Sequence, residues 1–514
     1  MDISYSRPES TGHSSDDDST LLDEKDLDEY DNASTVDAFS SQVASKRVLP
    51  QDSITRSSRS ILLSFLLFLL PSFVRTLWTR ERVKPQRLRG TAYLDGLRGL
   101  AAFAVFLCHL SYGTFDIAHS YGAGGAGQNT SWLQLPVVRL LYSGPLAVSM
   151  FFVISGYALS YKPIRQMHNR QHAELLSTLS SSVFRRTLRL YLPCFTSTFM
   201  SVCLAQLGVF RMTEDFSNHM RNVHEGHFWT APDLLTQVSQ WAGKSLLSIN
   251  VFDWSLFAGS TDLDHHLWTI PVELRCSLAL FVTHILVARM SSRVRLSTLT
   301  LLLVWGVCWD RWDLTPFWAG AMVAELDLRR NVLSSIVLDE LPYDAHFTGI
   351  KQPVVSWRKA VAITFLVTGL FLASYPDAAG HVSPGYQTLD RLIPSCFGER
   401  HRFWPNIGAA MIVWSMGRID WVKNVFNSRL MQYMGQISFP LYVVHGPMIH
   451  TFGYAAFERI YRYTGQEGRL FEYGFAAGAA CTILATVWVA DIFLRAVDQR
   501  CVDFAKWVEL RVLQ

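Results

Sequence analysis

His109 is an ionisable residue in a strongly apolar run, LAAFAVFLCHL, where lipid would make a charge costly. The same predicted helix begins with Asp95 and Arg98, and at 100° per residue the three side chains lie within about 60° of one another. Arg98 and His109 would stand about 16 Å apart along the axis, so they would meet different parts of one long ligand. A neutral imidazole is a natural general base near neutral pH. Alternatively, Asp95 caps the helix, Arg98 reaches lipid phosphates and His109 bonds to a neighbouring helix.

A cluster of arginines forms the second candidate group. In the run RRTLRL, Arg185 and Arg189 share a helix face at i,i+4, and Arg186 lies at i,i+3 from Arg189. Guanidinium groups suit phosphates, and a cytosolic acyl donor that carries phosphates is acyl-CoA. We therefore expect a donor clamp at the cytosolic mouth of a membrane span. The alternative is the ordinary excess of positive charge on cytosolic loops.

The run DHHLWTIPVEL supplies a third group. Pro271 suits the first position of a helix, which places His265 and His266 in the preceding loop and Glu273 in the first turn. Glu273 would orient or charge-balance His109, or bind the acceptor; alternatively, it only interacts with the helix dipole. The acidic residues and histidines of this run resemble part of a metal site. No second cluster of ligands is visible in the sequence, so we expect no metal ion.

A fourth group lies in SFPLYVVHGPMIH, where Tyr442 and His445 are at i,i+3. Pro440 and Pro447 flank them and are expected to open the helix; alternatively, the pair only packs and makes one hydrogen bond. The Ser-Gly pair at 155–156 lacks the GxSxG pattern of a nucleophile elbow. Small residues inside a span usually permit close helix packing, and we interpret this pair in that way.

The elements that must position these residues are membrane helices. Apolar residues make up 49% of the 514 residues and charged residues only 17%, against about 25% in a soluble protein. The predicted fold is an all-α polytopic membrane protein with about ten transmembrane helices. Residues 233–258 are moderately apolar and indicate an amphipathic or partly buried segment. The ten spans are placed near 95–112, 143–161, 188–209, 269–289, 297–313, 315–327, 358–376, 403–418, 432–453 and 471–494.

The two ends of the chain differ from this core. Residues 1–58 are rich in Ser, Asp and Glu, which predicts a disordered acidic cytosolic tail, and they show no secretory signal peptide. Residues 59–90 read as an interfacial helix and a basic linker, because the apolar run 61–74 is too short to span a bilayer. Residues 91–495 form the membrane domain, and 496–514 a cytosolic C-terminal segment.

Basic residues predict the orientation of the chain. With ten spans, every Lys/Arg cluster falls on one side of the membrane, so both termini are expected in the cytosol. The loop 113–142 then lies on the opposite side and carries the sequon Asn129-Thr130-Ser131, a predicted glycosylation site. We expect an endomembrane, such as the endoplasmic reticulum, or the plasma membrane.

Five motifs in chain order resemble those of the acyltransferase-3 family, whose members are multi-span membrane O-acyltransferases that modify carbohydrates, lipids and small metabolites. Each motif is loose, but five in this order are specific, and together they cover about residues 90–495. The motifs are YLDGLRG at 93–99 followed by His109, FFVISGY at 151–157, RRTLR at 185–189, HLWTIPVE at 266–273 and SFPLYVVH at 438–445.

The resemblance implies about ten spans, an acyl-CoA donor and His109 as the catalytic histidine. It also implies roles for Arg98, for the arginines of the 185–189 motif, and for Trp268 and Glu273. The chain departs from the simpler bacterial pattern in its acidic tail and in the extended segment 211–264. The latter leaves the acceptor open.

Our hypothesis from the sequence is an acyl-CoA-dependent O-acyltransferase. The arginines of the 185–189 motif, with Arg98, would hold the phosphates, while His109 takes the proton of an acceptor hydroxyl that attacks the thioester. Direct transfer is simplest, although an acyl-histidine relay is possible. The alternative is a proton-coupled transporter of an organic anion or lipid, against which we see no internal repeat. Further donor-site candidates are Asp95, Trp268, Tyr442 and His445.

The expected partners follow from this hypothesis. They are acyl-CoA as co-substrate, a hydroxyl-bearing acceptor and the lipid bilayer, with no nucleic acid and no permanently bound cofactor. Eight cysteines are scattered without a CxxC pair, which indicates neither a metal framework nor a disulfide array.

Overall fold

The structure is a computed structural model, and the part of the chain that it describes is helical, without strands. The predicted tail at residues 1–58, and most of the predicted interfacial segment 59–90, lie outside the described residues. The described residues are 67–72, 74–75, 88–125, 127–252, 264–339 and 355–512.

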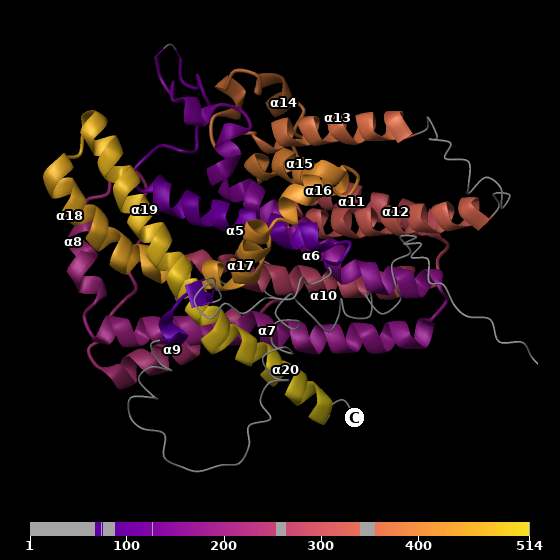
Figure 1. Ribbon diagram of the computed structural model, residues 1–514, viewed down its shortest axis with the longest axis horizontal. Coiled ribbons are helices and arrows are strands. Elements are labelled where there is room, and N and C mark those ends of the chain that lie inside the picture. Colours follow the sequence, from indigo (N-terminus) through magenta and orange to yellow (C-terminus); the bar gives the residue numbers. More distant parts are fainter. Residues whose placement is uncertain are drawn as a thin grey trace, which may run out of the picture.

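Several helices are suited to a bilayer. Most of the long helices run roughly along the longest axis of the molecule, whereas α19 crosses them obliquely (Figure 1). Among the described residues, five helical stretches are long and apolar enough to cross a membrane: α5 (Ala92–Tyr112), α6 (Gly144–His168), α7 (His172–Gln206), η4 with α10 (His265–Val287), and α19 (Gly468–Phe493) with its continuation to Val512.

Helices also cover the other five predicted spans, but they do not reach the same length and apolarity, so ten crossings remain a prediction. Some nevertheless present apolar side chains outward, such as Val367 on α13 and Leu301 on α11, as a lipid-facing helix would. These five helices are α11 (Ser292–Cys308), α12 (Leu314–Asp339), α13 (Val355–Ala373), α15 (Arg400–Met416) and α17 (Arg429–Met448).

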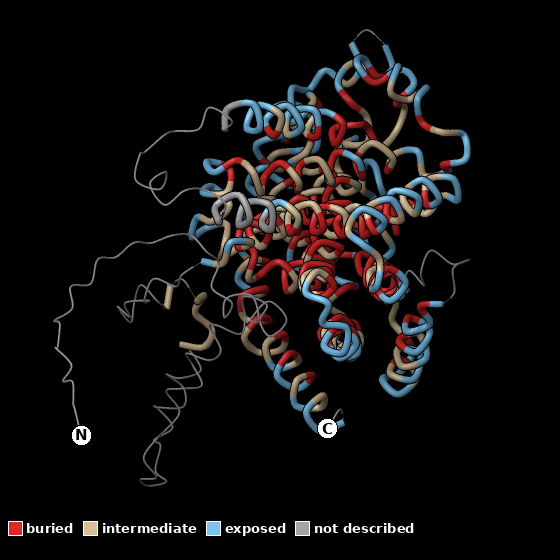
Figure 2. The backbone as a smooth tube through the Cα atoms, turned by 90° about the vertical axis from the view of Figure 1, so that its right-hand side faces the viewer, coloured by how far each residue is buried: buried red, intermediate tan, exposed pale blue. Residues whose placement is uncertain are grey.

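Shorter elements complete the fold. Figure 2 shows the buried segments gathered in the middle of the helical body, with exposed segments at its periphery. Helix α9 falls in the stretch predicted to be amphipathic, and Asp233 caps it by accepting a hydrogen bond of 2.9 Å from the backbone N–H of Thr236. The remaining helices are α8 (Glu214–Asn218), α9 (Leu234–Ser248), α14 (Gln387–Arg391), α16 (Asp420–Phe426), α18 (Tyr454–Thr464) and α20 (Gln499–Val512).

Two helix boundaries correct the sequence-based predictions. Helix α7 begins at His172 rather than near residue 188, because Leu175 and Leu179 bury one face of its polar first half. The arginines at 185–189 therefore lie in the middle of a long helix, and their place at the cytosolic mouth of the membrane span stays a prediction. Helix α10 begins at Thr269, so Pro271 is its third residue and Glu273 lies beyond its first turn.

Glycines permit the closest helix contacts. A Cβ atom at Gly435 of α17 would stand 2.5 Å from the carbonyl oxygen of Asp95 on α5. A Cβ atom at Gly156 of α6 would collide with the backbone of Phe317 on α12. This confirms the packing interpretation for Gly156, whereas the Ser155 hydroxyl donates a hydrogen bond of 2.9 Å to Glu273. The α5–α17 contact is the one that brings His109 and His445 into the same region.

Candidate active site

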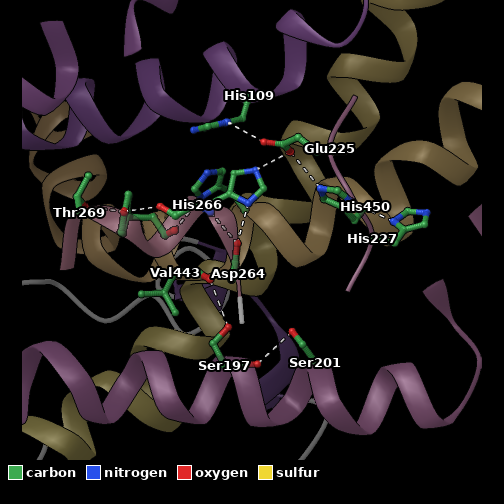
Figure 3. A network of polar contacts seen from close by, with 12 residues as sticks. His109, Ser197, Ser201, Glu225, His227, Asp264, His266, Thr269, Val443 and His450 are labelled. Carbon is green, nitrogen blue, oxygen red and sulfur yellow. Dashed lines mark hydrogen bonds and ion pairs between the residues drawn. The ribbon is translucent and has the colours of Figure 1, made fainter. Parts of the chain in front are cut away.

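A cluster of histidines and carboxylates lies at one end of α5, where four chain segments meet (Figure 3). Helix α5 supplies His109, and the loop after α8 supplies Glu225 and His227. Asp264 and the one-turn helix η4 (His265–Trp268) come next, and α17 with the π-helix η7 (Ile449–Gly453) closes the group. The histidine cluster, as we call it, consists of His109, Glu225, His227, Asp264, His266, His445 and His450.

Glu225 is the common partner of three histidines. Its Oε2 lies 3.1 Å from Nε2 of His266 and 3.1 Å from Nε2 of His450. Its Oε1 lies 4.0 Å from Nδ1 of His109. The side chain is only 16% exposed. A carboxylate in this position can fix the orientation of several imidazole rings at once.

His266 lies between two carboxylates. Nδ1 lies 2.7 Å from Oδ1 of Asp264, while Nε2 faces Glu225. The ring packs edge-on against His109, with centroids 4.4 Å apart. With 3% of its side chain exposed, His266 is buried beside the residue expected to act as base. Asp264 therefore holds the ring at Nδ1, while Nε2 lies near Glu225.

His445 and His450 approach the cluster from the end of α17. Nδ1 of His445 lies 2.7 Å from the carbonyl oxygen of Tyr442, and its ring centroid is 5.3 Å from that of His109. Nδ1 of His450 lies 3.0 Å from Nδ1 of His227, so one ring donates and the other accepts. In each case one ring nitrogen is occupied by a neighbour and Nε2 faces the cluster or its carboxylate.

Pro447 explains why the helix changes form between these two histidines. Proline has no N–H, so the carbonyl of Val443, one turn earlier, loses its usual partner. Ser197 of α7 donates a hydrogen bond of 3.2 Å to this carbonyl. The π-helix begins two residues later, and π-turns are frequent at functional sites. The expected opening is thus seen next to Pro447, whereas α17 continues as a helix through Pro440.

The electrostatics keep the two carboxylates ionised. Burial alone would raise the pKa of Glu225, but the neighbouring imidazoles, His266 foremost, lower it well below its usual range. The same balance holds for Asp264, whose pKa burial would raise and His266 lowers overall. The cluster therefore offers fixed negative charge next to His109.

A second feature, which we call the arginine pocket, opens between α5, α6, α7, α10 and α17. It is a cavity of about 280 Å³ in which five arginines face three carboxylates, so its charge is positive overall. Its charged lining residues are Arg89, Arg98, Arg185, Arg186 and Arg189, with Asp95, Glu273 and Asp498. The fold thus joins the first two arginine-bearing motifs of the sequence in one cavity, as the donor-clamp hypothesis requires.

The arginines are held in place by neighbours within the pocket. Arg186 pairs with Glu273 at 2.6 Å and donates to Ser277 at 2.7 Å. Arg98 lies 3.2 Å from Asp95 and donates to Ser438 at 3.0 Å. Such pairing restricts the guanidinium groups to defined directions, which favours a specific anion over a diffuse ion cloud.

Tyr442 connects the arginine pocket with the histidine cluster. It lines the pocket, and its hydroxyl lies 2.6 Å from the Thr269 hydroxyl while it donates to the carbonyl oxygen of His266 at 2.5 Å. Its own carbonyl accepts from His445. Tyr442 therefore lies between the arginine pocket and the histidine cluster, which is the arrangement expected for a long ligand with phosphates at one end.

Two predicted site residues lie elsewhere than expected. Glu273 contacts Arg186 and Ser155 in the arginine pocket; the carboxylate beside His109 is Glu225 instead. The Trp268 ring stacks near Arg402 and Trp312 and does not line the pocket.

Asn129, the residue of the predicted glycosylation sequon, is partly buried in the described structure. Its side-chain N–H donates a hydrogen bond of 2.8 Å to the carbonyl oxygen of Ala123, and its side-chain oxygen accepts one from Gln134. Glycosylation at this position therefore remains a prediction, and the modified form would have to give up these two hydrogen bonds.

The sequence interpretation missed Glu225, His227 and His450. All three are brought in by the segment after α7 or by the π-helix, and neither has a regular period that points to the site. A signal was present in the run His224-Glu225-Gly226-His227, where two histidines flank a carboxylate. This run also changes the basis of the metal prediction, because it provides the second ligand cluster that the sequence seemed to lack.

Comparison with known proteins shows the family of this chain. The acyltransferase domain of the Acyl_transf_3 family matches residues 91–495, and the chain belongs to this family. The relatives are themselves named as acyltransferases. An O-acetyltransferase, PaAT-1 of Phomopsis amygdali, is 32% identical over 467 residues, which is 87% of this chain and 89% of the relative.

Two further relatives extend this picture. Acyltransferase clz18 of Cochliobolus lunatus is 28% identical over 80% of this chain and 95% of its own length. Acyltransferase R4 of a Phoma species is 28% identical over 82% of this chain and 96% of its own length. No solved structure matches this chain significantly. The resemblance read from the motifs is confirmed, and acyl transfer is the activity of the family.

Proposed function

We propose that this protein is an acyl-CoA-dependent O-acyltransferase that uses His109 as its general base. The observation that carries the proposal is the position of Tyr442, which lies between a positive, arginine-lined cavity and the buried histidine cluster. Phosphates of the donor would occupy the cavity, and its thioester would reach past Tyr442 toward His109. Family membership favours this activity over the transporter alternative.

The proposed reaction is a direct transfer. The acceptor hydroxyl oxygen attacks the thioester carbonyl carbon while His109 takes the hydroxyl proton. The carbon–sulfur bond then breaks, and the proton passes to the departing thiolate, which leaves as free CoA. Glu225, ionised and 4.0 Å from Nδ1 of His109, would stabilise the transient imidazolium.

For the acceptor we propose only a broad class of molecule. One relative is named an O-acetyltransferase, which supports a hydroxyl acceptor and a short acyl group for this chain as well. The acceptor would be a hydroxyl of a small metabolite, a lipid or a carbohydrate. Comparing metabolites of cells with and without this protein would supply candidates for the assay.

The test is release of CoA thiol by the purified protein in detergent micelles, with acetyl-CoA and an extract of cells that lack it. Micelles have no gradient, so an enzyme turns over in them and a transporter does not. In His109→Ala the rate of acyl transfer should fall by several orders of magnitude, because no imidazole remains there to take the proton. His284→Ala is the control for loss of an imidazole, because this histidine is buried on α10 and lies outside the cluster.

Wild-type turnover in His109→Ala would refute the role of this histidine. Absence of thiol release by the wild-type protein in micelles, together with acyl-CoA-dependent uptake in sealed vesicles, would favour transport instead.

A further inference from the structure

We propose that Glu225, His266 and His450 bind a divalent transition-metal ion of the zinc class next to His109. One ligand atom from each of these residues lies within 4.8 Å of the other two. Two imidazoles and one carboxylate are a donor set that zinc and iron(II) sites commonly use, with a further position left open. The binding does not depend on the proposed acyl transfer; only the use of the ion in catalysis would.

The distances suit ligands that share one ion. Both imidazole Nε2 atoms lie 3.1 Å from Glu225 Oε2. With metal–ligand bonds of about 2.0–2.2 Å, neighbouring ligand atoms stand about 3.0–3.5 Å apart. Moreover, Nε2 of His266 is buried and its N–H direction does not form a hydrogen bond, although the carboxylate oxygen is near. The nitrogen is thus close to Glu225 without being aimed at it.

The contacts of the second ring nitrogen of each histidine also support a metal site. Metal-bound histidines almost always direct their other ring nitrogen to a carboxylate or another fixed acceptor. Here Nδ1 of His266 is held by Asp264 at 2.7 Å, and Nδ1 of His450 by His227 at 3.0 Å. In both rings Nε2 is the nitrogen left facing Glu225. The fold therefore turns both imidazoles with Nε2 toward Glu225, which is the orientation that a ligand needs.

The charge of the group also suits a cation. Among the described residues, all ion-pair contacts of Glu225 are with histidines: His109, His266 and His450. Asp264 adds a second carboxylate to the same buried group. A divalent ion would balance two carboxylates while the imidazoles stay neutral, and neutral imidazole is the ligand form.

An ion at this location could take part in catalysis, because it would lie beside His109. The ring of His109 is 4.4 Å from that of His266, so a substrate oxygen bound at the open position would lie beside the proposed base. An ion of this kind polarises a carbonyl or an acceptor hydroxyl. A second set, made of His109, His266 and His445, also brings its ligand atoms within 4.8 Å of one another. The two sets share only His266, which makes them separable by mutation.

The experiment measures binding of Zn²⁺ by the full chain in detergent micelles, in competition with a chromophoric chelator and without any acyl donor. Co²⁺ serves as a coloured substitute that reports the coordination. We expect one ion per chain and a loss of affinity of at least about tenfold in Glu225→Ala and in His450→Ala. His109→Ala and His445→Ala should keep the affinity, and His284→Ala is the control for the loss of a buried imidazole. Gel filtration and thermal melting establish that each variant is folded.

Several results would overturn the proposal. One is a wild-type protein that binds no ion stoichiometrically. Another is affinity that depends on His109 and His445 but not on His450, which would assign the ion to the second set. Equal affinity in His450→Ala, Glu225→Ala and His284→Ala would show adventitious binding. If the protein transfers acyl groups without the ion, the proposed function still holds. If the His109→Ala protein binds the ion but transfers no acyl group, metal binding and acyl transfer are shown to be independent.

Discussion

Gly446 of α17 lies so close to His266 of η4 that a Cβ atom at this position would stand 2.5 Å from Nδ1 of the imidazole. The same atom would meet the carboxylate oxygens of Asp264 at 3.0 and 3.1 Å. The turn that carries His266 can therefore pack against α17 only because residue 446 has no side chain. One glycine sets the position of the central imidazole and of the carboxylate that holds it.

Gly446→Ala should disturb the histidine cluster without replacing any polar side chain. The methyl group must push His266 and Asp264 away, at a cost of about 1–3 kcal/mol for overpacking. We expect transfer activity to fall at least tenfold, because His266 would leave its place beside His109. Thiol release and thermal melting measure the two effects.

Gly243→Ala is the matched control for this substitution. Gly243 lies inside α9 and a Cβ atom there meets nothing within 4 Å, so alanine should leave activity unchanged and stabilise the helix by about 0.5–1 kcal/mol. Full activity in Gly446→Ala would show that the position of His266 does not matter for transfer.

Much of the fold could be read from the sequence, because long apolar runs leave few alternatives to helices. Helices cover all ten predicted segments, and the close helix packing predicted for the Ser-Gly pair at 155–156 is found at Gly156. The extent of α7 could not be read in this way. Its first half is polar and held by two buried leucines, Leu175 and Leu179, a pattern weaker than an apolar run.

The sequence predicted the part of the site that lies in recognisable motifs and missed the part that lies in irregular segments. The arginine pocket and His109 come from motifs that are dense in unusual residues, so they stand out from a lipid-facing background. Glu225 and His450 come from a loop and a π-helix, whose side-chain directions follow from contacts made after folding. The sequence therefore offers Glu273, inside the HLWTIPVE motif, as one candidate partner of His109, whereas the fold gives that place to Glu225.

Stability should depend on acid pH through the carboxylates of the cluster. The pKa of Glu225 and that of Asp264 are lowered in the folded protein by the neighbouring histidines. A lowered folded-state pKa contributes stability above the unfolded value of about 4, and this stability is lost as pH falls below it. We expect the apparent melting temperature in micelles to fall steeply from about pH 5 to pH 3.

Glu225→Gln isolates this effect. The variant should melt lower than the wild type at pH 7 and approach it at acid pH, so its pH profile should be flatter. Glu214→Gln, at an exposed position of α8, should keep the wild-type profile. Parallel profiles for wild type and Glu225→Gln would contradict the lowered pKa.

The hydrogen bond from Ser197 to the carbonyl of Val443 should contribute to stability. Because Pro447 provides no N–H, Ser197→Ala would leave this carbonyl buried without a partner, at a cost of about 1–3 kcal/mol. Ser201→Ala is a close control on the same helix. Ser201 is equally buried, but its hydroxyl bonds to the carbonyl of Ser197 within α7, and that carbonyl keeps its helical partner. Equal melting of the two variants would show that Pro447 needs no compensation from α7.

The arginine pocket should determine affinity for the donor more than the rate of chemistry. Arg185 and Arg186 line the cavity together with Arg98 and Arg189 and lie on the far side of Tyr442 from His109. Arg185→Ala should raise KM for acetyl-CoA about tenfold, equivalent to about 1.4 kcal/mol, with a smaller effect on kcat. Arg186→Ala should do the same. Both variants also break an ion pair, that of Arg186 with Glu273 at 2.6 Å and that of Arg185 with Glu509 at 3.3 Å, so both should lower stability.

Phosphate recognition can be tested on both partners. In the wild type, KM should rise with salt and should be higher for acetyl-dephospho-CoA, which lacks one phosphate. In Arg185→Ala both differences should shrink, because the charge that reads the phosphate is gone. Arg293→Ala, at an exposed position of α11 outside the cavity, should behave as the wild type. If Arg185→Ala keeps the full preference for the phosphorylated donor, this arginine does not bind that phosphate, and the donor would have to enter by another route.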